Sequence, residues 1–119
     1  MEYETEDYKV REFGGVRVVR LKHANLTGAL EVNRITEELK AMVRQGVRRL
    51  VIDLKHVDHF GSGALGMLIA LSRKMTEAAG RLILSHPEKI EELLRISKTT
   101  SLFEIAPDPK SAVAMFAQD

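Results

Sequence analysis

Leu50-Val51-Ile52-Asp53-Leu54, followed by Gly61-Ser62-Gly63-Ala64-Leu65-Gly66, is the stretch that decides the fold of this chain. Its first part is an apolar run that predicts a buried strand, and its second part opens a helical pattern that continues to about residue 79. Gly80 is predicted to end this helix, and a second apolar run, Arg81-Leu82-Ile83-Leu84, follows it. Because a helix joins the two strands, they must run parallel in one sheet.

The helical pattern places Ser62 on the solvent side of the helix. At about 100° per residue, one arc collects apolar side chains and predicts the face that lies on the sheet. These side chains are Ala64, Leu68, Leu71, Met75 and Ala78. The opposite arc carries Gly66, Ile69 and Arg73, and extending it back by one turn adds Ser62. We therefore expect an outward-facing Ser62 and an exposed Ile69, and an exposed aliphatic side chain beside small residues suits a docking surface.

Two roles fit a serine where a loop enters a helix. It can cap the helix, because its hydroxyl accepts a hydrogen bond from a backbone N–H group of the first turn. It can also accept a phosphate, since an exposed hydroxyl is reachable and the new negative charge lies at the positive end of the helix dipole. The residues alone favour the cap.

The remaining segments predict further strands and helices around this unit. Residues 1–7 are polar and acidic and predict a flexible lead-in. Alternating runs at 8–13 and 16–21, joined by Gly14-Gly15, predict a β-hairpin. Further helices are predicted in segments 32–46, 87–94 and 108–116, and a brief edge strand in 102–106.

Together these elements predict a single α/β domain over residues 8–119. Its sheet should be mixed and mostly parallel, opened by the antiparallel hairpin and covered by about four helices. A chain of 119 residues with 45% hydrophobic content is long enough to bury such a core.

The composition excludes several classes of function. A net charge of +1 gives no electrostatic reason to expect nucleic acid or an anionic membrane as partner. The absence of cysteine excludes disulfides and thiol chemistry. No apolar run approaches the roughly 20 residues that span a bilayer, and the acidic amino terminus is unlike a secretory signal. We therefore expect a soluble, cytoplasmic protein.

Gly61-x-Gly63-x-x-Gly66 matches the dinucleotide-binding fingerprint letter for letter. In that fingerprint the first glycine follows the strand directly and an acidic residue ends the second strand to hold the ribose. Here residues 55–60 separate the glycine from the strand, and Ser85 and His86 occupy the place of the acid. A nucleotide or dinucleotide binder is therefore a distant alternative, and we predict no cofactor.

A hydrolase and a metal site are the other catalytic interpretations, and each lacks residues that it requires. The order Gly61-Ser62-Gly63 lacks the Gly-x-Ser-x-Gly spacing of a hydrolase elbow. His56, Asp58 and His59 are three potential metal ligands within one loop, but no further histidine has a recognisable ligand spacing. We predict neither an enzyme nor a metal site.

These segments resemble STAS domains, the anti-sigma factor antagonist family of bacterial transcription regulation. The resemblance is carried by 51–54, 61–66 and 80–84, and it continues to Phe116, so that it covers the chain from about Tyr8. It implies that Ser62 is phosphorylated by a partner that is both a serine kinase and an anti-sigma factor. The unphosphorylated domain would bind that partner, and the phosphorylated domain would release it.

The resemblance also implies a partner-binding surface on the outer face of the helix and the preceding loop. Its residues are Asn25, Thr27, Gly61, Ser62, Gly63, Gly66, Ile69 and Arg73. The domain would act as a monomer or weak homodimer on a protein partner, without direct contact to nucleic acid.

The chain departs from the family pattern beside the serine. The frequent Asp-Ser-Ser-Gly-Leu motif reads Gly61-Ser62-Gly63-Ala64-Leu65 here, and a common Gly-x-Leu-Asp motif is replaced within residues 23–27. A branch of the family serves as a scaffold or adaptor without the phosphorylation switch, and this remains the alternative function.

Overall fold

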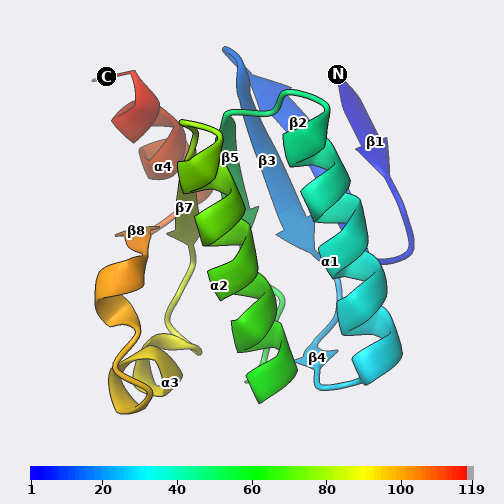
Figure 1. Cartoon of the computed structure of the whole chain (residues 1–119), viewed down its shortest axis with the longest axis vertical. Helices are drawn as coiled ribbons and strands as arrows, with labels where there is room; N and C mark the ends of the chain where they lie inside the picture. The colour runs from blue at the N-terminus through cyan, green and yellow to red at the C-terminus, as the bar shows by residue number, and fades with distance from the viewer. Residues whose placement is uncertain (118–119) are drawn as a thin grey trace.

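Figure 1 shows the computed structural model of the chain, which describes residues 1–117. Within that range the strands are β1 (Glu2–Glu4), β2 (Tyr8–Phe13), β3 (Val16–Leu21), β4 (Asn25–Leu26), β5 (Arg49–Asp53), β6 (His59–Phe60), β7 (Arg81–Ser85) and β8 (Glu104–Ala106). The helices are α1 (Ala29–Arg44), α2 (Ser62–Glu77), α3 (Glu91–Ile96), the short 3-10 helix η1 (Thr100–Leu102) and α4 (Pro109–Phe116). The last two residues of the predicted domain, Gln118 and Asp119, lie outside the described residues.

The predicted mixed sheet is confirmed. Within residues 1–117 six strands form one sheet in the order β1-β2-β3-β5-β7-β8. The β1–β2 and β2–β3 pairs are antiparallel, whereas β3–β5, β5–β7 and β7–β8 are parallel. Gly14 and Gly15 make the hairpin turn with φ values of 55° and 82°, a left-handed conformation that glycine adopts at little cost.

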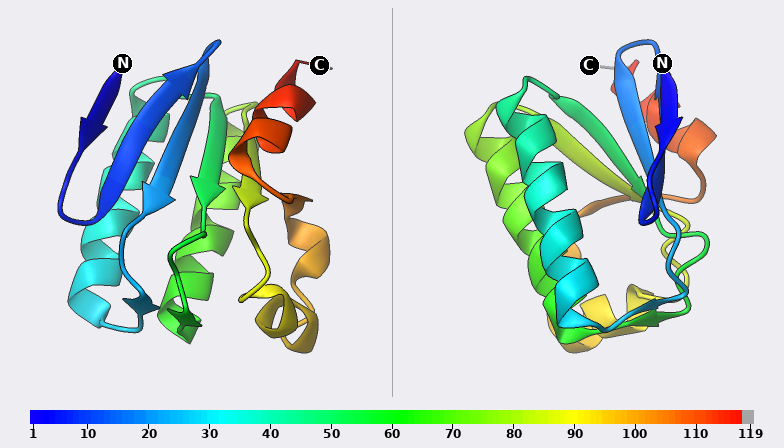
Figure 2. Two further views of the ribbon diagram at one scale, coloured as in Figure 1. Left: turned by 180° about the vertical axis from the view of Figure 1, so that it is seen from behind. Right: turned by 90° about the vertical axis from the view of Figure 1, so that its right-hand side faces the viewer.

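Helices cover the two faces of the sheet unequally, as Figure 2 shows. α1 and α2 lie side by side on one face, whereas α4 packs on the other face against β3, β5, β7 and β8. Successive strand side chains point to opposite faces, so each parallel strand feeds both layers. In β5, for example, Leu50 and Ile52 join the larger core under α1 and α2, and Val51 joins the smaller core that contains Phe116 of α4.

Residues 1–7 are not a flexible lead-in, and that prediction is wrong. β1 pairs antiparallel with β2, and Asp7 is only 1% exposed. Glu2 lies 3.2 Å from the Lys9 ammonium, and Glu4 lies 2.7 Å from the Lys22 ammonium. The acidic side chains that suggested a solvated tail instead face cations of the hairpin, so the segment forms an outer strand of the sheet.

The sequence predicts that Gly80 ends α2, but the structure gives this glycine a different role. α2 ends at Glu77, and Ala79 rather than Gly80 takes the left-handed conformation, with φ of 60°. Gly80 permits a close approach of two backbones, because a Cβ atom there would lie 2.9 Å from the Arg48 carbonyl oxygen.

The described helices give no sign of a membrane segment. Among residues 1–117, none combines the length and the apolar character that crossing a bilayer demands.

Candidate functional site

A small parallel sheet of β4 and β6 brings the loop before α1 beside the start of α2. Asn25 pairs with His59 in this sheet. The Ala24 carbonyl oxygen accepts hydrogen bonds from the backbone N–H groups of Asp58 and His59, at 2.7 and 2.9 Å. The polar connection 22–27 is therefore partly strand, which its sequence did not predict, and it holds Asn25 and Thr27 next to the α2 amino terminus.

Gly61 is the residue that lets these two segments meet. Its N–H group donates to the Leu26 carbonyl oxygen at 3.0 Å, and an added Cβ atom would lie 3.3 Å from that oxygen and 3.4 Å from the Thr27 Cα atom. Gly61 is also the N-cap of α2, and no side chain caps the helix. The prediction that Ser62 is the cap is wrong, because the close approach at Gly61 starts the helix one residue earlier.

Ser62 is the first residue of α2, and its side chain is exposed, as the helical pattern predicts. Within residues 1–117 its hydroxyl has no hydrogen-bond partner. The first helical hydrogen bond runs from the Leu65 N–H group to the Gly61 carbonyl oxygen at 3.1 Å, which leaves the preceding N–H groups of α2 without an acceptor inside the helix. No acidic residue occupies the first turn, so the positive end of the helix dipole is uncompensated there.

Ser62 opens onto a groove between α1 and α2. Both helices begin at the same end of the domain (Figure 1), so two amino termini flank the groove. Small or uncharged residues line it: Leu26, Thr27, Gly28, Ala29, Val32, Asn33, Thr36, Gly61, Ser62, Gly63, Ala64, Gly66, Met67 and Ala70. A surface of this kind allows a close approach by another protein and offers no side-chain charge to a phosphate.

The structure brings together most of the predicted partner-binding residues. Thr27, Gly63 and Gly66 are exposed and line the groove with Ser62 and the half-buried Gly61. At Gly66 an added Cβ atom would meet no atom within 4 Å. Asn25 is exposed in β4, and Arg73 is exposed further along α2.

Ile69 departs from its prediction. It is half-buried and packs against the larger core, so it is not an exposed aliphatic side chain. η1 lies against this side of α2, where the Ser72 hydroxyl donates to the Leu102 carbonyl oxygen at 3.3 Å. A helical wheel cannot show such a contact with a later segment of the chain.

The sequence also gave no sign of a buried carboxylate behind the β4 loop. Asp7 accepts two hydrogen bonds from the Arg34 guanidinium, each at 2.7 Å, and lies 2.7 Å from Nε2 of His23. The Arg34 hydrogen bonds, opposed by desolvation and assisted by His23, lower the pKa of the Asp7 carboxyl to about 2. Asp7 thereby ties the amino-terminal segment to α1 and to the residue that begins the 23–27 loop.

A second buried carboxylate occupies the carboxyl ends of β5 and β7. Asp53 contacts Nε of Arg20 at 3.0 Å, the Ser85 hydroxyl at 3.0 Å and Nδ1 of His86 at 2.7 Å. Ser85 and His86 are therefore committed to Asp53 at the place where a dinucleotide site needs a ribose-binding acid. Gly61 follows β6 rather than β5, so the glycine fingerprint lacks its structural context.

The histidine loop forms no metal cluster within residues 1–117, where no three side chains of ligand type come together. His56 and His59 are exposed. Asp58 pairs with the Lys89 ammonium, which lowers the pKa of its carboxyl.

A mixed sheet with two parallel helices on one face and an exposed serine at the start of the second helix defines a class of small α/β domains. The sequence model of the STAS domain matches residues 7–112. The chain belongs to the STAS domain family.

Three similar proteins have related descriptions. BtrV of Bordetella bronchiseptica, named as a candidate anti-sigma factor antagonist, is 27% identical over 92 residues, which are 76% of this chain and 79% of BtrV. An anti-sigma-factor antagonist (STAS) domain protein from Planctomyces limnophilus has a TM-score of 0.77 at 22% identity, covering 92% of this chain and 98% of its own. The Bacillus cell fate determinant SpoIIAA in its phosphorylated form has a TM-score of 0.68 at 17% identity, with coverages of 92% and 98%. The two structures share the fold of this chain.

Proposed function

We propose that this domain is a cytoplasmic anti-sigma factor antagonist whose partner is a serine kinase that also acts as an anti-sigma factor. In this proposal the unphosphorylated domain sequesters the partner, and phosphorylation of Ser62 ends the complex. Family membership supports a regulatory rather than an enzymatic role. The description of BtrV as a candidate antagonist and the phosphorylated form of SpoIIAA support the same role and the same kind of switch.

The observation that carries the proposal is the state of the Ser62 hydroxyl. It is exposed at the uncapped amino terminus of α2 and, within the described residues, has no protein hydrogen-bond partner to give up. A kinase can therefore reach it without unfolding any part of the domain. The open N–H groups of the first turn favour the phosphate once it is attached.

The uncharged groove determines how that phosphate would act. None of the residues that line the groove carries a charge, so the phosphate has no arginine or lysine there to draw it into a new internal contact. We expect the fold of the phosphorylated domain to stay the same. The added charge of about −2 instead lies in the partner interface, where it must be desolvated when the complex forms.

Exposed residues around Ser62 form the partner-binding surface in this proposal. They are Asn25, Thr27, Gly63, Gly66 and Arg73. Gly66 offers the sharpest probe of this surface, because the fold leaves space for a side chain there. A Gly66→Leu variant should keep the fold and lose partner affinity through steric obstruction alone.

The test is to incubate the purified domain with the serine kinase encoded beside its gene and ATP, and to measure intact mass. We expect one added phosphate in the wild type and in a Ser101→Ala control, and none in Ser62→Ala. Ser62→Asp should fold normally and bind the kinase about tenfold more weakly or worse, since ~1.4 kcal/mol of interface cost corresponds to a factor of ten. Phosphate on Ser62→Ala, or unchanged affinity of Ser62→Asp, would refute the switch.

The adaptor function is favoured by the two residues that flank Ser62. Gly61 and Gly63 stand where the family motif often has aspartate and serine, so the hydroxyl lacks these polar neighbours. An adaptor would bind its partner through the same groove, accept no phosphate and lose affinity in Gly66→Leu. A domain that binds the partner but accepts no phosphate is therefore the adaptor. If the domain neither binds the partner nor accepts a phosphate, there is no partner site at this groove.

A further inference from the structure

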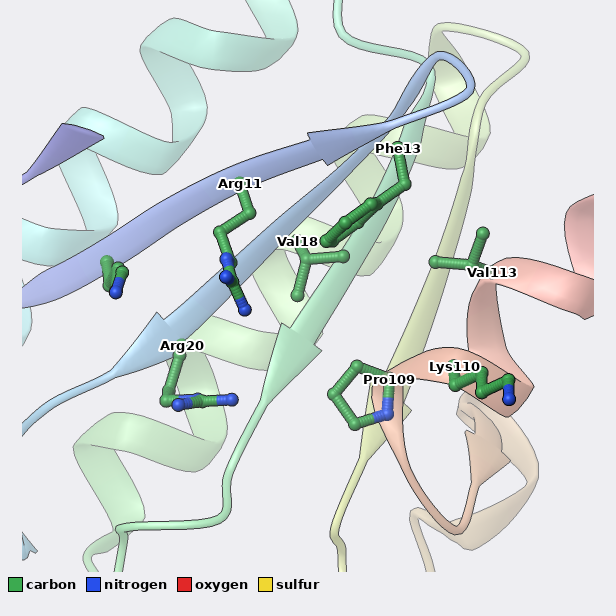
Figure 3. Close-up of a pocket in the computed structure, with 8 residues that line it drawn as sticks. Arg11, Phe13, Val18, Arg20, Pro109, Lys110 and Val113 are labelled. Atoms are coloured by element: carbon green, nitrogen blue, oxygen red, sulfur yellow. The ribbon is translucent and has the colours of Figure 1, made fainter. Parts of the chain in front are cut away.

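The sheet face opposite α1 and α2 carries an unusual set of side chains beside α4. The antiparallel register of β2 and β3 sets Lys9 opposite Arg20 and Arg11 opposite Val18. Phe13 lies two residues beyond Arg11 on the same side of β2, because alternate residues of a strand share a face. Figure 3 shows the Phe13 ring directed toward Val18, Arg11 directed toward Arg20, and Arg20 directed toward Pro109 at the start of α4.

These side chains and α4 enclose a groove of about 250 Å³. Its lining consists of Lys9, Arg11, Phe13, Val18, Arg20, Pro109, Lys110 and Val113. Four of the eight are cations and none is acidic, whereas the others are apolar. The groove thus joins an apolar floor to a positively charged rim.

This arrangement costs stability in the unliganded domain. Like charges directly opposite each other in an antiparallel pair are destabilising, and Lys9 faces Arg20 in this way. Arg20 is paired with the buried Asp53 at 3.0 Å, whereas Lys9 and Arg11 share one exposed carboxylate, Glu2, at 3.2 and 3.6 Å. Lys110 makes no ion pair within residues 1–117, and its acidic neighbour Asp108 instead caps α4. Two cations placed opposite each other, with no contact that repays the repulsion in full, indicate a functional site.

The apolar part of the groove fits a flat body. The Arg11 guanidinium carbon lies 5.8 Å from the centroid of the Phe13 ring, so a planar cation and an aromatic ring already lie beside each other at the rim. The Pro109 ring and the Val113 side chain face them from α4 (Figure 3). A planar apolar group can lie among these surfaces while its acidic group reaches Arg11 and Arg20.

We propose that this groove binds a small organic carboxylate with a flat apolar body. Guanidinium groups suit a carboxylate because their forked N–H groups donate two parallel hydrogen bonds. A small ligand is favoured over a peptide strand, since β2 and β3 are paired on both sides and offer no free edge. α4, which lines this groove, lies on the face opposite the α1–α2 layer (Figure 2), so this site is additional to the one proposed at Ser62.

The test follows amide chemical shifts of the full chain during titration with naphthoate. Acetate carries the carboxylate without the flat apolar group, and naphthalenemethanol carries the flat apolar group without the negative charge. We expect naphthoate to shift the amides of Arg11, Phe13, Val18 and Val113 and to bind about tenfold more tightly than either analogue. Equal binding of naphthalenemethanol, equal binding of acetate, or shifts confined to the α1–α2 groove would each overturn the proposal.

Two charge-removing variants and one control locate the anion. Arg11→Gln and Arg20→Gln should each weaken naphthoate binding by about tenfold, the usual effect of losing one charge-assisted contact. Lys74→Gln removes the same charge from an exposed position on α2 and should bind like the wild type. Wild-type affinity in both groove variants would contradict the proposal. It would also be contradicted if an acidic aromatic peptide bound more tightly than naphthoate and displaced it, because that result would indicate a protein partner.

Discussion

Replacing Asp7 with asparagine should destabilise the domain by an amount that its pKa predicts. The native environment lowers the pKa of this carboxyl from 3.8 to about 2, chiefly through the two hydrogen bonds from Arg34. That difference corresponds to roughly 2 kcal/mol of folding free energy at neutral pH, since one pKa unit is worth about 1.4 kcal/mol. Because the Asp7 side chain is only 2% exposed, solvent screens this interaction little.

The pH dependence of the Asp7→Asn effect has a definite sign. A carboxyl whose pKa is lowered on folding stabilises the protein fully above its unfolded value of 3.8, and this contribution disappears as the pH falls through about 2. The gap in unfolding free energy between wild type and Asp7→Asn should therefore be about 2 kcal/mol at neutral pH and should close over that acidic range.

Urea unfolding followed by circular dichroism at a series of pH values measures this gap. Glu6→Gln is the matched control, because Glu6 lies 3.4 Å from the same Arg34 but is exposed, and exposed ion pairs are worth about 0–1 kcal/mol. A gap below about 0.5 kcal/mol at neutral pH, or a gap that stays constant on acidification, would refute the importance assigned to Asp7.

Two glycines and one aromatic residue give further tests by urea unfolding. Gly66→Ala should stabilise the domain by about 0.5–1 kcal/mol, because alanine is the better helix former and its Cβ atom meets nothing within 4 Å; a loss of stability would contradict this. Gly61→Ala should instead destabilise the domain by about 1 kcal/mol, since its Cβ atom lies 3.3 Å from the Leu26 carbonyl oxygen, and a neutral effect would argue against the tight β4–β6 contact. Phe116→Ala should cost about 3–5 kcal/mol, because Phe116 is 1% exposed in the smaller core, and a loss below about 1 kcal/mol would mean that α4 is not essential to that face.

The sequence predicts the central part of the fold because its physical signals there are local. The apolar runs of β5 and β7 with a helix between them require parallel strands, and Gly14-Gly15 requires a tight turn. Asp108 before Pro109 is a start signal of the same local kind, and the Asp108 carboxylate indeed accepts a hydrogen bond from the Ser111 N–H group at 2.7 Å.

The missed features depend on contacts between distant parts of the chain. β1 looks like a solvated tail until Lys9 and Lys22 are placed beside its glutamates. The two-residue strands β4 and β6 are too short for periodicity to reveal them, and only their mutual pairing creates the site beside Ser62. Helical spacing correctly predicts an exposed Ser62, because its exposure depends on the direction of α2 alone, but it fails for Ile69, which packs against the larger core.

The most direct measurement compares kinase affinity before and after phosphorylation of the same purified domain. Isothermal titration should give tight binding for the unphosphorylated protein, about tenfold or more weakening after phosphate addition, and no weakening in kinase-treated Ser62→Ala. Equal affinities for the unmodified and phosphorylated forms would contradict the proposed role of Ser62 as the switch.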